Sequence, residues 1–163
     1  MPKADIGIDV RMWSHPGIGR YIRELAGELF RLEGPSRFLL LASSGDVAAL
    51  RERLPGAHIE RSGSRVYGIG EQFELARFSG LVRLLHVPHF NVPLFSRAKF
   101  IATVHDLIYL KESRFSGSPL GGLYVKTLVR AIEKNAKAVI AVSDFTRRDL
   151  ESAFPGTAGK TQV

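Results

Sequence analysis

Short apolar runs alternate with amphipathic helical patterns along almost the whole chain, and this alternation most limits the folds available to it. Several of the runs are apolar at every position, which is typical of strands that are buried on both sides. The runs occupy residues 4–10, 38–42, 57–61, 84–87, 99–104 and 138–142. Helical patterns begin near residues 17, 47, 71, 118 and 144. The sequence therefore predicts an α/β fold, in which helices cover both faces of a parallel sheet.

Two of the predicted connections depend on glycine, proline and serine. Residues 62–70 are rich in glycine and predict a mobile loop. Ser118-Pro119 predicts a helix start, with serine as the cap and proline at the first helical position.

Polar residues and glycines follow the predicted strands. They lie at residues 9–19, 86–91, 105–106 and 143–144. In open parallel sheets, ligands bind outside the carboxyl ends of the strands. We therefore expect these segments to converge on one crevice.

The segment Gly17-Ile18-Gly19 lies between the first strand and the first helix. Its backbone N–H groups could lie beside a phosphate or a sugar hydroxyl. It lacks the dinucleotide-binding pattern, because Ile22 stands where a third glycine or alanine would be, which disfavours a nicotinamide-dependent enzyme. It is not a P-loop either, since no Gly-Lys-Ser/Thr follows. A tight turn into a helix is the alternative interpretation.

Histidines mark the ends of two later strands. His105, followed by Asp106, could exchange a hydrogen bond with a ligand hydroxyl, or it could be a structural histidine bonded to a loop carbonyl. His86 and His89 have a spacing that can bind metal on a helix, but they span a strand end and a proline, and no Cys or Glu completes a set. We therefore predict no metal site. We expect His89 to shape the cleft or to pack, with Asn91 as a hydrogen-bonding neighbour.

The charge balance favours anionic partners. The chain has 23 basic and 16 acidic residues and no cysteine. The basic residues are scattered over helices rather than interleaved with aromatics, so nucleic-acid binding is not predicted. A basic surface in water and contact with an anionic membrane both remain open. The sequence has no apolar run of about 18 residues, and a cytoplasmic location is expected.

Four stretches, in order, resemble family 4 glycosyltransferases, the retaining nucleotide-sugar enzymes of the GT-B fold. The subgroup most similar is the mannosyltransferase-like one of bacterial cell-surface polysaccharide assembly. The four stretches are residues 6–25, 85–94, 102–108 and 141–150.

The resemblance implies that residues 1–163 are one Rossmann-like N-terminal domain on the acceptor side of an interdomain cleft. Residues 160–163 look like the last strand before the family's second domain. That donor-binding domain, with the two glutamates that contact the donor, is expected to be absent, so the isolated chain is expected to be inactive. The implied partners are a nucleotide-sugar donor and a saccharide or lipid-linked acceptor, with no cofactor and no catalytic metal. The alternative is a non-catalytic partner or membrane-docking module of a split enzyme.

The resemblance also implies roles for single residues. Gly17 and Gly19 would approach the donor diphosphate and sugar, and His105 would lie beside the transferred sugar as the catalytic residue. The expected acceptor-side or cleft residues are Asp9, His89, Asn91 and Asp106.

Overall fold

A single seven-stranded sheet forms the centre of the protein in the computed structural model, which describes residues 4–111 and 119–163. All neighbouring strands run parallel, in the order β3-β2-β1-β4-β5-β6-β7. Their bounds are β1 Ala4–Asp9, β2 Phe38–Ser43, β3 His58–Ser62, β4 Val82–Val87, β5 Lys99–Val104, β6 Ala136–Ala141 and β7 Thr161–Gln162.

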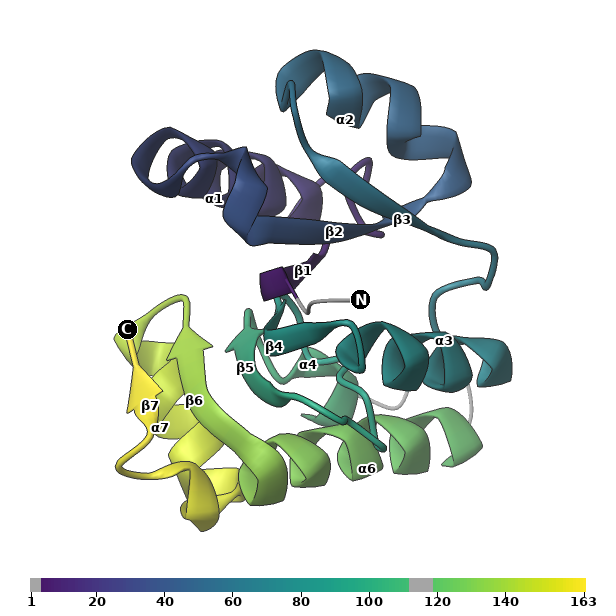
Figure 1. Ribbon diagram of the computed structural model, residues 1–163. Coiled ribbons are helices and arrows are strands. Elements are labelled where there is room, and N and C mark those ends of the chain that lie inside the picture. Colours follow the sequence, from purple (N-terminus) through teal and green to yellow (C-terminus); the bar gives the residue numbers. More distant parts are fainter. Residues whose placement is uncertain (1–3, 112–118) are drawn as a thin grey trace.

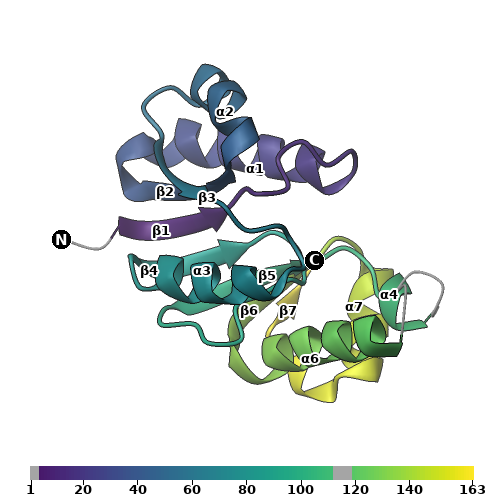
Figure 2. The ribbon, with the colours of Figure 1, turned by 90° about the vertical axis from the view of Figure 1, so that its right-hand side faces the viewer.

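Helices cover both faces of this sheet (Figure 1). Helices α1 and α2 lie on one face, and α3 and α6 lie on the other (Figures 1 and 2). Their bounds are α1 Ile18–Glu33, α2 Val47–Arg53, α3 Ile69–Ser79, α4 Ile108–Lys111, α6 Pro119–Asn135 and α7 Asp144–Ala153. Single 3₁₀ turns cover Pro35–Arg37, Ser44–Asp46 and Pro155–Thr157. The predicted α/β, Rossmann-like parallel sheet is confirmed.

Each face of the sheet has its own apolar core. The core under α1 and α2 includes Leu40, whereas the core under α3, α6 and α7 includes its neighbour Leu41. Both side chains are buried, because successive residues of a strand point to opposite faces. This arrangement explains why residues 38–42 are apolar throughout instead of alternating with polar residues.

Two predicted boundaries are changed by the structure. Strand β3 extends to Ser62 and α3 already begins at Ile69, so the loop predicted over 62–70 is shorter. Helix α4 was not predicted. Pro119 is the first described residue of α6, as the sequence indicated, whereas the predicted cap Ser118 lies outside the described residues. Among the described helices, none combines the length and apolar composition that a membrane span requires.

The strand order determines where a ligand can bind. Strand β1 pairs with β2 on one side and with β4 on the other, so the connections leave the sheet in opposite directions at this point. A crevice opens at the carboxyl edge of a parallel sheet where the strand order reverses in this way. The segments after β1, β4 and β5 meet at this edge.

Candidate functional site

A crevice of about 400 Å³ lies at the carboxyl edge of the sheet. Four of the expected residues line it, namely Gly17, His89, His105 and Asp106. The crevice is completed by Met12, His15, Ile18, Tyr67 and Phe90. The fold thus brings the glycine segment and two histidine segments together, although they are separated by up to 88 positions, from residue 17 to residue 105.

His105 stands directly after β5 and is half-buried. Its Nε2 lies 2.9 Å from the carbonyl oxygen of Pro88. A carbonyl can only accept a hydrogen bond, so Nε2 carries the proton in this contact. Burial lowers the pKa of His105, although the Pro88 carbonyl acts in the opposite direction. The ring is therefore neutral at pH 7, and its Nδ1 is an acceptor. His105 is thus bonded to a loop carbonyl, as one interpretation of the sequence held, and it also lines the crevice, as the other required.

Asp106 is exposed, and its Oδ1 accepts a hydrogen bond of 3.0 Å from the N–H of Ile108. This contact lies at the start of α4, where backbone N–H groups need acceptors. The second carboxylate oxygen of Asp106 can reach a ligand in the crevice.

The glycine segment uses its N–H groups within the chain. The N–H groups of Gly17 and Ile18 each lie 3.3 Å from Nδ1 of His15, and the N–H of Gly19 donates to the His15 carbonyl at 3.0 Å. Gly19 does not line the crevice. A Cβ on Gly19 would lie 2.4 Å from the carbonyl oxygen of Trp13, so this glycine permits a close approach of helix and turn. A phosphate that used the N–H groups of Gly17 and Ile18 would have to displace the His15 side chain.

Asp9, predicted as a cleft residue, is fully buried and does not line the crevice. Its two carboxylate oxygens accept hydrogen bonds of 2.8 and 2.7 Å from Nε and Nη2 of Arg11. Burial by itself would raise the pKa of Asp9, but the Arg11 guanidinium outweighs this effect and holds the pKa far below its ordinary value. Asp9 is therefore an ionised partner of Arg11 beneath the crevice.

Glu71 and Asn91 extend this buried network across the sheet edge. Nη1 of Arg11 donates to Oε2 of Glu71 at 3.2 Å, and Nδ2 of Asn91 donates to the same oxygen at 2.7 Å. Like Asp9, Asn91 is fully buried and lies outside the crevice lining. The sequence did not single out Glu71, because it lies 60 residues after Arg11 and only the fold brings the two together.

His89 connects this network to the crevice. Its Nδ1 accepts a hydrogen bond of 3.1 Å from the N–H of Asn91, so in the neutral ring Nε2 carries the proton. That Nε2 lies 3.6 Å from Oδ2 of Asp9. Within the described parts of the chain, neither Nε2 of His89 nor Oδ1 of Asn91 has a hydrogen-bond partner. Such unsatisfied buried atoms are uncommon in folded proteins.

His86 does not face the same way as His89. Its Nε2 lies 3.0 Å from the hydroxyl of Thr103, which in turn lies 3.1 Å from the hydroxyl of Tyr21. Burial lowers the pKa of His86 to about 4, and the nearby charge of His89 contributes. Within residues 4–111 and 119–163, no cluster of three or more His, Asp or Glu side chains is arranged to bind a metal ion.

Sequence reasoning missed several crevice residues. His15 carried a usable signal. It stands two positions before Gly17, so its side chain is close enough to accept hydrogen bonds from the N–H groups at the start of the helix. Tyr67 and Phe90 carried none, because both lie in connections without a repeating pattern. The ring centroids of Tyr67 and Phe90 are 6.0 Å apart.

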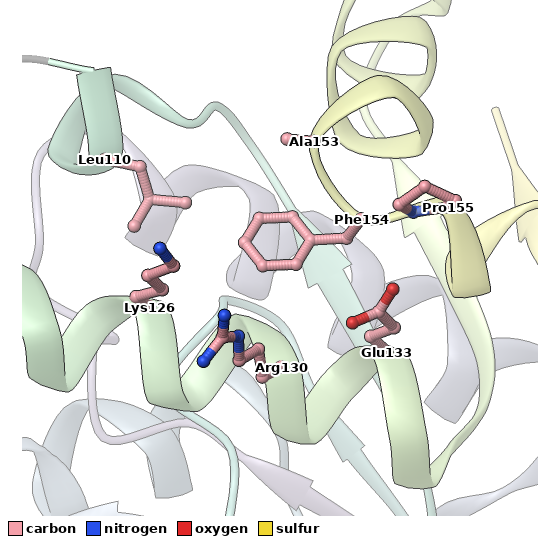
Figure 3. Close-up of a pocket in the computed structure, with 7 residues that line it drawn as sticks. All are labelled: Leu110, Lys126, Arg130, Glu133, Ala153, Phe154 and Pro155. Atoms are coloured by element: carbon pink, nitrogen blue, oxygen red, sulfur yellow. The ribbon is translucent and has the colours of Figure 1, made fainter.

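A second hollow, of about 470 Å³, lies among the helices away from the crevice (Figure 3). Lys126 and Arg130 of α6 project into it, opposite Leu110 and Phe154. No strand end contributes to it, so it lacks the convergence of polar groups that distinguishes the crevice. Lys126 and Arg130 are exposed.

Comparison with known families gives a direct result. The family model described as Glycosyltransferase Family 4 matches residues 16–163. A search of curated proteins found no match to the chain. The family match covers most of the chain, including the glycine segment, both histidine segments and the sheet from β2 onward. The chain therefore belongs to glycosyltransferase family 4.

Proposed function

We propose that this domain forms the acceptor side of a retaining glycosyltransferase that moves a sugar from a nucleotide-sugar to a saccharide or lipid-linked acceptor. The family supports glycosyl transfer. The observation that carries the site assignment is the crevice at the carboxyl edge, with neutral His105 facing it. The mannosyltransferase-like subgroup and bacterial polysaccharide assembly are the proposed setting.

His105 contacts the transferred sugar in this proposal. With Nε2–H held by the Pro88 carbonyl, Nδ1 accepts a hydrogen bond from a sugar hydroxyl and orients the ring. Asp106 and His89 contact the acceptor from neighbouring strand ends. The segment at Gly17 and Gly19 approaches the donor diphosphate once His15 has moved.

A second, donor-binding domain completes the site in this proposal. All the residues that line the crevice in the described parts of the chain come from this one domain, and transition-state stabilisation requires groups on both sides of the reacting bond. We therefore expect no sugar transfer by the 163-residue chain alone. Turnover by the purified chain above a blank reaction would contradict this.

Replacing His105 tests the site. In the enzyme that carries both domains, His105→Ala should lower turnover about a hundredfold, the usual effect of losing one positioned polar group. His58→Ala is the matched control, because His58 is exposed on β3 at the opposite edge of the sheet. An unchanged rate for His105→Ala would remove this residue from the mechanism.

The pH dependence of turnover gives a second test of His105. Its lowered pKa keeps the ring neutral at pH values somewhat below 6.5, the ordinary histidine pKa, so turnover should persist there. Turnover should fall at more acidic pH, when Nδ1 becomes protonated and can no longer accept a hydrogen bond. A rate that rises on acidification would contradict the assigned role.

Contact with an anionic membrane, as a docking module at the inner face of the cell membrane, is the second candidate function. The observation that favours it is the pair of exposed cations, Lys126 and Arg130, at the rim of the hollow in Figure 3. Sedimentation with anionic liposomes should decrease as salt rises and in the Lys126→Gln/Arg130→Gln variant. Arg51→Gln, on the opposite face, is the control. Salt-independent sedimentation would contradict this candidate.

A further inference from the structure

An aromatic groove lies beside the crevice, between the first turns of α3 and α6, which cover the same face of the sheet (Figure 2). It has a volume of about 470 Å³. Of the residues that the structure describes, those that line the groove include no charged side chain. Phe73 and Phe95 are 76% and 73% exposed on it. Exposed rings gathered in one groove usually mark a binding surface. We call this surface the aromatic groove; its lining includes Tyr67, Gln72, Phe73, Phe95, Gly121 and Tyr124.

Tyr67 connects the aromatic groove to the crevice, because its side chain lines both. Its backbone has φ of 66°, a left-handed conformation that bulky residues rarely adopt. Such strain persists only where the surrounding structure enforces it, and it is frequent at ligand sites. Since one ring borders both spaces, a single elongated ligand can occupy them together.

The polar side-chain atoms of Gln72 and Tyr124 in the aromatic groove are already bonded within the protein. Gln72 accepts a hydrogen bond of 2.9 Å from the N–H of Leu94 and donates one of 3.0 Å to the hydroxyl of Tyr124. That hydroxyl donates to Oε1 of Glu71 at 3.2 Å. The groove therefore offers ring faces rather than hydrogen-bonding partners. A saccharide would leave its hydroxyls unsatisfied there, whereas a hydrocarbon chain would not.

We infer that the aromatic groove holds the hydrocarbon carrier of a lipid-linked acceptor, while the sugar end of that acceptor lies in the crevice beside His105. This rests on the proposed function, and it selects the lipid-linked acceptor over a free saccharide. The carrier leaves the crevice past Tyr67 and packs against Phe73 and Phe95. The rings of Phe73 and Phe95 are then shielded from water only when the acceptor is bound.

The test compares two sugars that differ only in an apolar tail. Octyl β-glucoside, below its micelle concentration, and methyl β-glucoside are titrated into the isotope-labelled chain, and NMR shifts are followed. We expect octyl β-glucoside to bind about tenfold more tightly, because burying several methylenes is favourable. It should shift signals of Phe73 and Phe95, which line only the groove, whereas methyl β-glucoside should shift only crevice signals such as those of His105 and Met12.

Two variants test whether the tail binds in the aromatic groove. Phe73→Ala/Phe95→Ala should abolish the tail-dependent gain and leave methyl β-glucoside binding unchanged; both side chains are exposed, so the core is untouched. Leu32→Ala, a 64% exposed residue on α1, should change neither. Equal affinity for the two glucosides, or a gain that survives the double variant, would overturn the inference. So would a dimer of the unmodified chain that the double variant converts to monomer, because the groove would then bind a second copy.

The same titration distinguishes failure of the inference from failure of the proposed function. Shifts at His105 without a tail-dependent gain overturn the lipid carrier and leave sugar binding in the crevice intact. Tail-dependent shifts at Phe73 and Phe95 without any at His105 remove the sugar from the crevice, and with it the proposed function on which the inference rests.

Discussion

The two sides of the crevice satisfy their polar groups in different ways. On the glycine side, residues 12–19, most hydrogen bonds are local, although the Ser14 hydroxyl donates to Asp46, and His15 accepts the N–H groups that a ligand would otherwise use. On the strand-end side, the partners come from distant parts of the chain, and Nε2 of His89 remains unsatisfied within the described residues. The side that looks most like a binding motif in sequence is thus closed in this structure. On the strand-end side, His89 is buried, whereas the half-buried His105 and the exposed Asp106 line the crevice.

This difference shows where the binding capacity of the crevice lies. Local contacts satisfy the polar groups of a segment without help from the rest of the fold. The glycine side therefore has to rearrange before its N–H groups can bind an anion. Long-range contacts instead hold the buried strand-end side chains in place, and His105 and Asp106 still line the crevice above them. Substitutions should therefore have large, cooperative effects on the strand-end side and smaller, local effects on the glycine side.

The largest effect is expected for Asp9→Asn. This change leaves Arg11 buried with less than its full charge compensation, and breaking a buried pair costs about 3–5 kcal/mol of unfolding free energy. Urea unfolding at pH 7 measures it. Asp5→Asn is the control, because its pairs with Arg37 and Arg83 are exposed and should be worth less than about 1 kcal/mol. Equal losses of unfolding free energy for the two substitutions would show that the buried network stabilises the strand-end side no more than an exposed ion pair does.

The next largest effect is the loss of stability at acidic pH that comes from His86. The folded-state pKa of His86 is lowered to about 4, so the unfolded chain binds the proton more readily. The stability that comes from keeping His86 neutral is complete above pH 6.5 and is lost as pH falls from 6.5 towards 4, in total on the order of 3 kcal/mol. Urea unfolding at several pH values measures the slope. His86→Gln should flatten the slope between these limits, and an unchanged slope would contradict the assignment.

Two glycine-to-alanine changes on the glycine side and a third farther along α1 should differ in sign and size. Gly19→Ala brings a Cβ against the Trp13 carbonyl and should cost about 2–3 kcal/mol, as overpacking does. Gly17→Ala should be close to neutral, since its nearest neighbour would be Nδ1 of His15 at 4.0 Å. Gly27→Ala meets nothing within 4 Å and should stabilise α1 by about 1 kcal/mol. Thermal unfolding ranks the three variants. An unchanged melting temperature for Gly19→Ala would show that the turn can shift to accommodate the added Cβ.

A small and local effect is expected for His15→Ala. The change removes the acceptor of the Gly17 and Ile18 N–H groups, so the start of α1 loses its cap at a cost of about 1 kcal/mol. Hydrogen exchange of the first turn of α1 should rise, while that of β4 and β5 stays unchanged. A uniform increase over the whole domain would contradict the local character of the glycine side.

Much of the fold was predictable because it rests on short-range patterns. Residues 99–104 were predicted as a strand with the same bounds as β5, since an apolar run between polar residues indicates a buried strand. The last helix was predicted to begin near residue 144, and the hydroxyl of Ser143 caps it there by accepting a hydrogen bond of 3.1 Å from the N–H of Thr146. Helix α4 was missed, because four residues are too short to show a helical period.

The candidate site was predictable in position but not in detail. Parallel strands place their carboxyl ends at one edge, which is why His89, His105 and Asp106 could be expected together. Asp9 and Asn91 follow the same strand ends, yet they point below the crevice into the buried network with Arg11 and Glu71. The position of a residue at a strand end does not by itself show whether its side chain lines the crevice or joins a buried network with groups from other parts of the chain.

The sequence by itself determined the family, the parallel sheet and the edge at which the candidate crevice opens, because apolar periodicity and strand-end residues are local properties of the chain. Only the tertiary structure decided which polar atoms remain open at that edge. The reason is physical: a buried donor or acceptor must find a partner, and the partners of Arg11, His105 and Asn91 include groups that lie far from them in the chain.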